Sequence, residues 1–232
     1  MEDLAGETGS AVEATVQPAT GGSERVPPED MWPALGLTPE LADRFEQARF
    51  DLTIGLPRPD EPIAPAVLEL TRLADRVAEL ATGCVHDPAA QRFFGPGTWR
   101  IPDRLAEIDV REHVTIHAVG AEGPAGGWIH THGLIKFGRP EFEIYDVPEN
   151  MAAGTAAALN DLGQYVLTGA FVAPGQTVGD PSVPMQARPG TREPGHWGKI
   201  PALELVDVDE QGEAATGATR GLRAWWPENF PE

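Results

Sequence analysis

The spacing of apolar residues predicts a chain built from both helices and strands. The clearest helix is expected over residues 62–82, where apolar residues recur every three or four positions and charged residues fill the other face. A second long helix is expected over 149–168. A shorter helix is expected to begin at Thr38, which can cap the first turn, with Pro39 at the first helical position.

Strands are expected where apolar and polar residues alternate or where β-branched residues gather. These segments cover residues 52–56, 84–86, 91–94, 113–119, 128–131, 141–147 and 202–208. Strands interrupted by two long helices predict an α+β fold. We therefore expect one open, mostly antiparallel sheet with the two main helices packed on one face.

Two segments lack a regular pattern. Residues 1–30 hold seven acidic residues, one basic residue and no aromatic residue. Such a segment buries too little apolar surface to offset the entropy lost on ordering, so we expect a disordered acidic tail before a single domain over 31–232. Residues 171–199 contain five prolines and five glycines and predict a long mobile loop. Within it, His196 and Trp197 form either a lid or a surface aromatic group that pins the loop.

Composition narrows the classes of partner. The net charge is −19, from 17 basic and 36 acidic residues, which argues against nucleic-acid binding because that affinity comes mainly from Lys and Arg. No apolar run of about 18 residues is present, so no membrane span or membrane partner is expected. The acidity favours solubility or a basic partner protein. The single cysteine, Cys84, excludes an internal disulfide and fits a reducing, cytoplasmic compartment.

One segment, over residues 127–146, carries candidate chemistry. Residues two apart on a strand share a face, so His130 and His132 should lie on one side of their strand. Glu141 and Glu143 should likewise share a face of the following strand. If these strands form an antiparallel hairpin, His132 falls beside Glu141 and His130 beside Glu143, at the distance of cross-strand pairs.

Three interpretations of this hairpin are open. In the first, which we expect, it is a polar sheet face in which one imidazole donates to one carboxylate and no cofactor is bound. In the second, His130, His132 and Glu143 bind zinc, because His nitrogen and carboxylate oxygen are ligands of catalytic zinc. In the third, one histidine is a general base oriented by its carboxylate partner, without a metal.

The segment that ends at His132 resembles the zinc motif of JAMM-type metalloproteases. Glu143 stands eleven residues after His132, at the position of that family's Asp ligand. The chain departs from the motif at three positions, including Pro140, which occupies the place of the family's Ser. The resemblance also implies an upstream catalytic Glu, for which Glu112 and Glu107 are candidates.

A second resemblance covers more of the chain. The sequences His-Thr-His-Gly-Leu at 130–134 and Phe-Gly-x-Pro-Glu-x-Glu at 137–143 are similar to the signature of a bacterial family of unknown function. The upstream Asp-Pro-x-x-x-Arg element at 87–92 is also similar, and the resemblance extends over roughly residues 50–175. It implies a fold class and a bacterial origin and no particular chemistry.

These observations leave two candidate functions. The first is a non-enzymatic bacterial cytosolic module that binds another protein, of the stress-response or toxin-neutralisation type; the acidic charge and the incomplete catalytic set favour it. The second is a zinc-dependent hydrolase that uses His130, His132 and Glu143, with Glu112 or Glu141 as its general base. Convergence of these side chains in the fold would separate the two.

Overall fold

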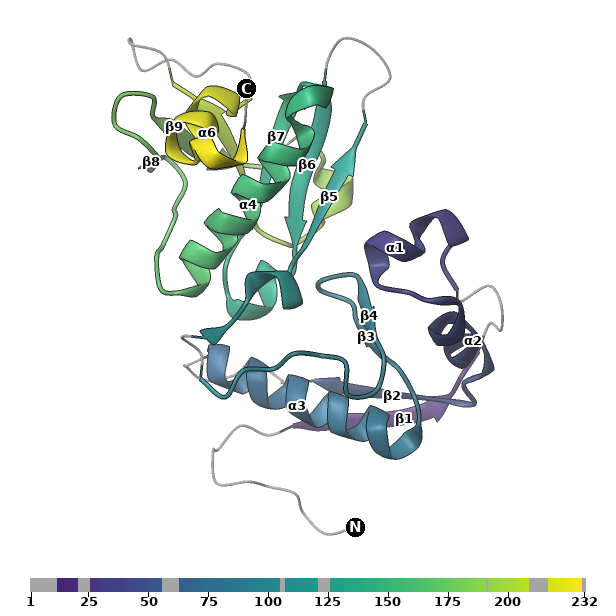
Figure 1. Ribbon diagram of the computed structural model, residues 1–232. Coiled ribbons are helices and arrows are strands. Elements are labelled where there is room, and N and C mark those ends of the chain that lie inside the picture. Colours follow the sequence, from purple (N-terminus) through teal and green to yellow (C-terminus); the bar gives the residue numbers. More distant parts are fainter. Residues whose placement is uncertain are drawn as a thin grey trace. The chain divides into compact units, whose positions relative to one another are not determined.

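The chain folds into two compact units, one ending at Ile108 and the other beginning at Asp109. This division, seen in a computed structural model, differs from the single domain expected over 31–232 (Figure 1). The structure describes residues 12–20, 26–55, 63–104, 107–120, 126–190, 192–208 and 217–230.

The first unit contains a two-stranded antiparallel ribbon. Strand β1 (Glu13–Pro18) pairs with β2 (Phe50–Gly55), from Glu13 opposite Gly55 to Pro18 opposite Phe50. Residues 13–18 therefore form a strand where the sequence predicts a disordered tail. Backbone pairing can order a segment that buries no side chain, and every residue of β1 is exposed. Residues 1–11 and 21–25 of the predicted tail lie outside the described residues.

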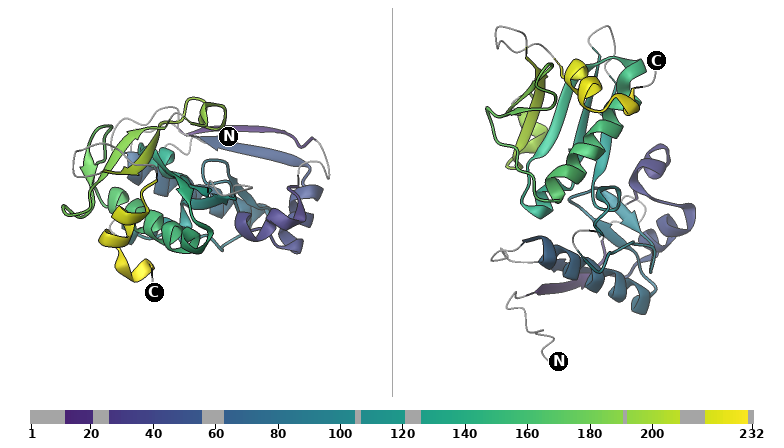
Figure 2. Two further views of the ribbon diagram at one scale, coloured as in Figure 1. Left: turned by 90° about the horizontal axis from the view of Figure 1, so that it is seen from above. Right: turned by 60° about the vertical axis from the view of Figure 1, so that its left-hand side comes forward.

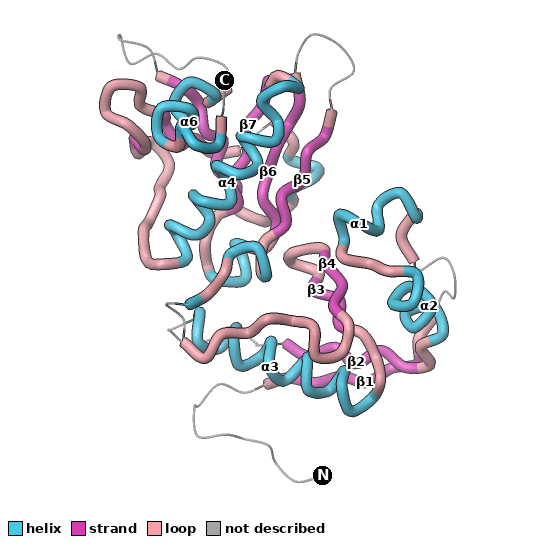
Figure 3. Tube along the Cα trace, in the orientation of Figure 1, coloured by secondary structure: helices cyan, strands magenta, loops and turns pink. Residues whose placement is uncertain are grey.

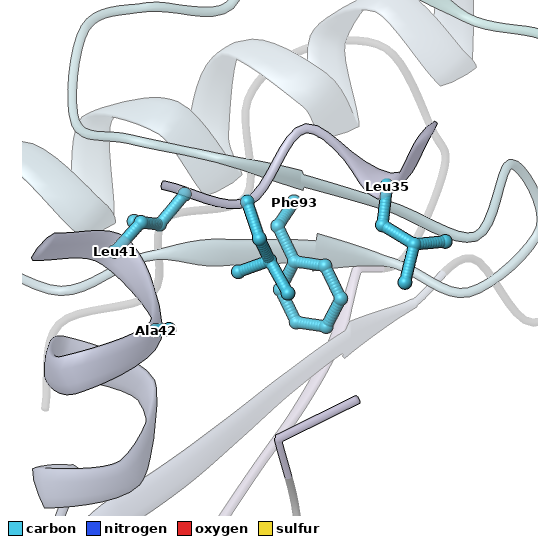
Figure 4. Packing of buried hydrophobic residues seen from close by; sticks show 5 residues of the cluster. Leu35, Leu41, Ala42 and Phe93 are labelled. Atoms are coloured by element: carbon cyan, nitrogen blue, oxygen red, sulfur yellow. The ribbon is translucent and has the colours of Figure 1, made fainter. Parts of the chain in front are cut away.

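The helices of the first unit follow the predicted pattern. The Thr38 hydroxyl accepts a hydrogen bond from the Leu41 amide at 3.2 Å, so the predicted cap is confirmed. Leu41, Leu35 and Phe93 pack with their neighbours into a small apolar core (Figure 4). The remaining elements of this unit are η2 (Glu29–Met31), α1 (Trp32–Leu35), α2 (Pro39–Gln47), α3 (Ile63–Ala81), β3 (Val85–Asp87) and β4 (Arg92–Phe94).

The second unit is built on a six-stranded sheet with the order β5-β6-β7-β10-β9-β8 (Figure 3). The α+β class is confirmed, and the sheet is mixed because β7 and β10 run parallel whereas the other neighbours are antiparallel. A parallel pair arises because α4 and the two strands β8 and β9 intervene between β7 and β10 along the chain. The strands are β5 (Thr115–Val119), β6 (Gly127–His132), β7 (Glu141–Val147), β8 (Thr177–Val178), β9 (Met185–Pro189) and β10 (Ala202–Asp207).

Helix α4 (Ala152–Leu167) covers one face of this sheet (Figures 1 and 2). Its Leu159 and Leu162 are fully buried, as are Phe142 and Ile144 of β7. Burying such side chains contributes roughly 1.5–3 kcal/mol each and holds the helix on the sheet. Because α3 belongs to the other unit, the expected pair of main helices on one sheet is not observed.

The C-terminal segment docks on α4. The segment consists of α6 (Thr219–Trp225) and η7 (Pro227–Asn229). Its approach is so close that a Cβ at Gly154 would lie 2.4 Å from the Asn229 carbonyl oxygen. A glycine is therefore required in α4 at this crossing.

The proline- and glycine-rich stretch over 171–199 is more regular than expected. It contains β8 and β9, which extend the sheet, and the four-residue helix α5 (Pro194–Trp197). Periodicity missed these elements because they are short and each is bounded by Pro or Gly. Other short 3-10 turns in this unit are η4 (Val110–Glu112), η5 (Leu134–Phe137) and η6 (Glu149–Met151).

Candidate functional site

The register of β5, β6 and β7 brings histidines from two strands together. His117 of β5 lies directly opposite His130 of β6. On the other side of β6, His130 lies opposite Glu143 of β7, so the predicted antiparallel pairing of these strands is confirmed at that position. Because alternate residues share a face, His117, His130 and His132 project from one face of the sheet.

These three histidines form a compact cluster. Each offers one ring nitrogen, and the three nitrogens all lie within 4.8 Å of one another. His130 and His132 are buried, and His117 is partly buried. This face is opposite the one that carries Ile129 and α4, so the cluster is separate from the apolar core of the unit.

The cluster is held in the uncharged form. Burial, and then the neighbouring imidazoles, lower the pKa of His130 to about 2 and that of His132 to about 3. Burial and His196 also lower the pKa of His117. The neutral imidazole is the form that coordinates metal ions.

Several ring nitrogens of the cluster are buried without a hydrogen-bond partner among the described residues. They are both nitrogens of His130 and Nε2 of His117. An unsatisfied buried polar group costs about 1–3 kcal/mol. The interpretation in which His130 donates to a carboxylate is therefore not observed, although Glu143 lies opposite it in the ladder.

A fourth histidine reaches the cluster from α5, which lies on the face away from α4 (Figure 1). His196 Nε2 lies 3.0 Å from His132 Nε2, and its ring centroid lies 4.9 Å from that of His130. The adjacent Trp197 is buried and meets the His130 ring edge-on at 5.4 Å. Trp128 of β6 stacks on the His130 ring, with 3.8 Å between the ring centroids.

Glu143 joins α5 to the sheet. Its fully buried Oε2 accepts hydrogen bonds from Trp128 Nε1 at 3.2 Å, Tyr145 Oη at 2.9 Å and Trp197 Nε1 at 2.8 Å. Burial, and then this hydrogen bond to Glu143, raise the pKa of Tyr145. Three donors thus converge on Oε2 of the carboxylate predicted as a metal ligand, whereas its buried Oε1 has no hydrogen-bond partner among the described residues. Glu143 is not a member of the group of three histidines.

The two predicted general bases are not placed at the cluster. Glu141 is buried and accepts hydrogen bonds from Thr131 Oγ1 at 2.7 Å and from the backbone amides of Gly133 and Ile135 at 2.9 and 3.0 Å. Burial raises the pKa of Glu141, and these hydrogen bonds oppose that rise. Its carboxylate therefore anchors the turn after β6. Glu112 lies in η4, which packs against α4.

His117 was not among the residues predicted for the site, and His196 was not connected with the other histidines. A signal for His117 was present, because the strands at 113–119 and 128–131 are separated by one short glycine-bounded turn. Closing that turn as a hairpin pairs 117 with 130. No comparable local signal exists for His196, which is 64 residues from His132 and reaches it through the fold.

Gly190 provides a test of how tightly the Glu143 carboxylate is packed. A Cβ at this position would lie 2.3 Å from Glu143 Oε1 and 3.0 Å from the Ala202 side chain. We expect Gly190→Ala to destabilise the second unit by about 1–3 kcal/mol, because the well-packed carboxylate must move. Denaturant unfolding followed by tryptophan fluorescence measures the change.

Gly195→Ala is the matched control, since nothing lies within 4 Å of a Cβ at that position of α5. We expect it to change the free energy of unfolding by no more than about 0.5 kcal/mol. Equal effects of the two substitutions would show that the Glu143 carboxylate is not held against Gly190.

No family model matches the chain, and no curated protein or solved structure matches it either. The two resemblances drawn from the motif around His130 and His132 therefore stay predictions. Within the described ranges, every helix is too short or too polar to cross a membrane.

Proposed function

We propose that the second unit is a metal-dependent hydrolase whose metal ligands are His117, His130 and His132. The observation that carries this proposal is the convergence of three ring nitrogens within 4.8 Å on one sheet face. Three histidines with a fourth position left for water are one of the ligand sets of catalytic zinc. Zinc is the ion that this all-nitrogen set favours among common hydrolytic metals.

The electrostatics of the cluster support the same proposal. Lowered pKa values leave His130 and His132 neutral near pH 7 and ready to coordinate without first losing a proton. An ion would also take one of the two His130 ring nitrogens that are buried without a partner among the described residues. Such an ion lowers the pKa of a bound water and polarises a carbonyl or phosphoryl oxygen.

The surrounding side chains have roles that need no direct contact with the ion. Trp128 and Trp197 pack against the His130 ring and exclude water from it. Glu143 fixes both indoles through their N–H groups. The Glu143 carboxylate therefore acts indirectly, through the aromatic side chains that orient the imidazoles. In this proposal that indirect role replaces the role of third metal ligand, which the sequence predicted for Glu143.

This proposal takes the second of the two sequence-based candidates. The first, a non-enzymatic module that binds a basic partner protein, rests on the net charge of −19, which equally serves solubility. The hydrolase rests on a defined set of side chains. The cluster differs from the predicted set in one ligand, because His117 takes the place of Glu143.

The proposal is tested by hydrolysis assays with p-nitrophenyl acetate and bis-p-nitrophenyl phosphate. We expect hydrolysis of one or both by protein loaded with one equivalent of Zn²⁺, and a loss of at least about 100-fold after removal of the metal. His117→Ala should reduce the rate similarly, whereas His86→Ala in the first unit should not. Zinc-loaded protein that hydrolyses neither ester nor phosphodiester above the His117→Ala background would contradict the hydrolase.

A further inference from the structure

We propose that His196 is a fourth, releasable metal ligand, and that α5 covers the metal site when His196 is bound. This inference rests on the proposed function, since it assigns a ligand and an access step to the same site. In this proposal the described structure is the closed form of the site, with His196 over the strand histidines. In the open form the three strand histidines remain and the fourth position is free for water or substrate.

The distance between His196 and His132 fits this role. Their Nε2 atoms are 3.0 Å apart, which in the absence of a metal is a hydrogen bond in which one imidazole donates and the other accepts. Two nitrogens bound tetrahedrally to one zinc ion at about 2.0–2.1 Å lie about 3.3–3.4 Å apart. The observed separation differs from that value by only a few tenths of an ångström.

His196 differs from the strand histidines in its attachment. His117, His130 and His132 are fixed by the backbone ladders of β5 and β6. His196 is exposed and sits on a helix of four residues. Moving it away requires no ladder hydrogen bond to break, so it is the one of the four that can leave while the sheet stays intact.

The attachment of α5 is specific and small enough to be reversible. The Trp197 indole donates to Glu143 at 2.8 Å, and its ring lies 5.3 Å from that of His132. Before α5, Arg192 forms ion pairs with Glu204 at 2.8 Å and with Asp146 at 3.1 Å. A partly exposed ion pair contributes about 0–1 kcal/mol, so the buried Trp197 is the main anchor.

The segment therefore couples two events. When Trp197 occupies its place beside Glu143, His196 is held over the strand histidines and the metal position is closed to solvent. When Trp197 leaves, the imidazole leaves with it, and the fourth position opens. Opening of α5 would then precede substrate binding, as loop and lid movements do in many enzymes.

Cobalt provides a test, because Co²⁺ replaces zinc in nitrogen sites and its visible absorption reports coordination number. We expect the wild-type protein with one equivalent of Co²⁺ to give an intense four-coordinate spectrum that added azide changes little. His196→Ala should still bind one Co²⁺, with affinity lowered at least about 10- to 100-fold, and its spectrum should shift on addition of azide.

Trp197→Phe tests the anchoring of α5 separately from metal binding by His196. It retains a ring at the anchor position and loses the N–H that donates to Glu143. We expect His196 to remain able to bind, with azide sensitivity between that of the wild type and His196→Ala. Gly195→Ala, on the same helix and free of steric conflict, should behave as the wild type.

The outcomes distinguish this inference from the proposed function. A wild-type protein that binds no Co²⁺ at the histidines would overturn both. Stoichiometric Co²⁺ binding with the same spectrum, affinity and azide response in wild type and His196→Ala would overturn the role of His196 alone. An azide response in Trp197→Phe no larger than that of the wild type would contradict the proposed anchoring.

Discussion

Substitution of His130 by alanine is expected to abolish stoichiometric zinc binding. His130 lies directly opposite His117 of β5 and two residues before His132 on β6. Its removal leaves two strand histidines and only the releasable His196 beside them, a set too weak to retain an ion through dialysis. We expect zinc content after dialysis to fall from about one ion per chain to below about one tenth, measured by elemental analysis.

Because His130 is buried, its replacement can also disturb folding. His117→Ala is a second variant that avoids this difficulty, since His117 is partly exposed and lies on the edge strand of the sheet. His86→Ala, an exposed histidine of the first unit, is the control and should keep its zinc. Retention of one zinc ion by a folded His117→Ala protein would show that these three histidines are not the ligands.

Addition of zinc is expected to stabilise the second unit strongly. A ligand that binds the folded state alone stabilises it by about 2.7 kcal/mol at a free concentration one hundred times its Kd. The three histidines are brought together by the register of β5 and β6, so the unfolded chain lacks the site. For a unit of this size that stabilisation corresponds to a rise in Tm of roughly 10 °C.

Differential scanning calorimetry can assign the rise to one unit. The transition of the second unit should move upward with zinc and return when a chelator is added, whereas the transition of the first unit should stay in place. In His117→Ala the same additions should leave both transitions unchanged. A zinc-induced rise of equal size in that variant would point to binding elsewhere on this acidic chain.

The sequence predicted the elements with long or regular patterns. Helices α3 and α4 and strands β5, β6, β7 and β10 lie where periodicity placed them, within a few residues at each end. Short elements such as α5 and β8 were missed because a helix of four residues or a strand of two is too short to show a periodic pattern. Strand β1 was missed because it buries no side chain and is specified by its partner β2.

The candidate site was predictable in part, for physical reasons that differ between residues. His130 and His132 were visible because a strand places alternate residues on one face. The role given to Glu143 as a metal ligand stays a prediction, and sequence spacing could not show that three hydrogen-bond donors converge on its Oε2. The position of His196 depends on packing of Trp197, a tertiary contact with no local signature.

The central claim is that the strand histidines bind a metal ion, and X-ray absorption at the zinc edge tests it most directly. Protein loaded with one equivalent of Zn²⁺ should show a nitrogen shell at about 2.0–2.1 Å with the outer-shell scattering of at least three imidazoles. A zinc environment of oxygen ligands without imidazole, or zinc that gel filtration removes completely, would contradict the claim.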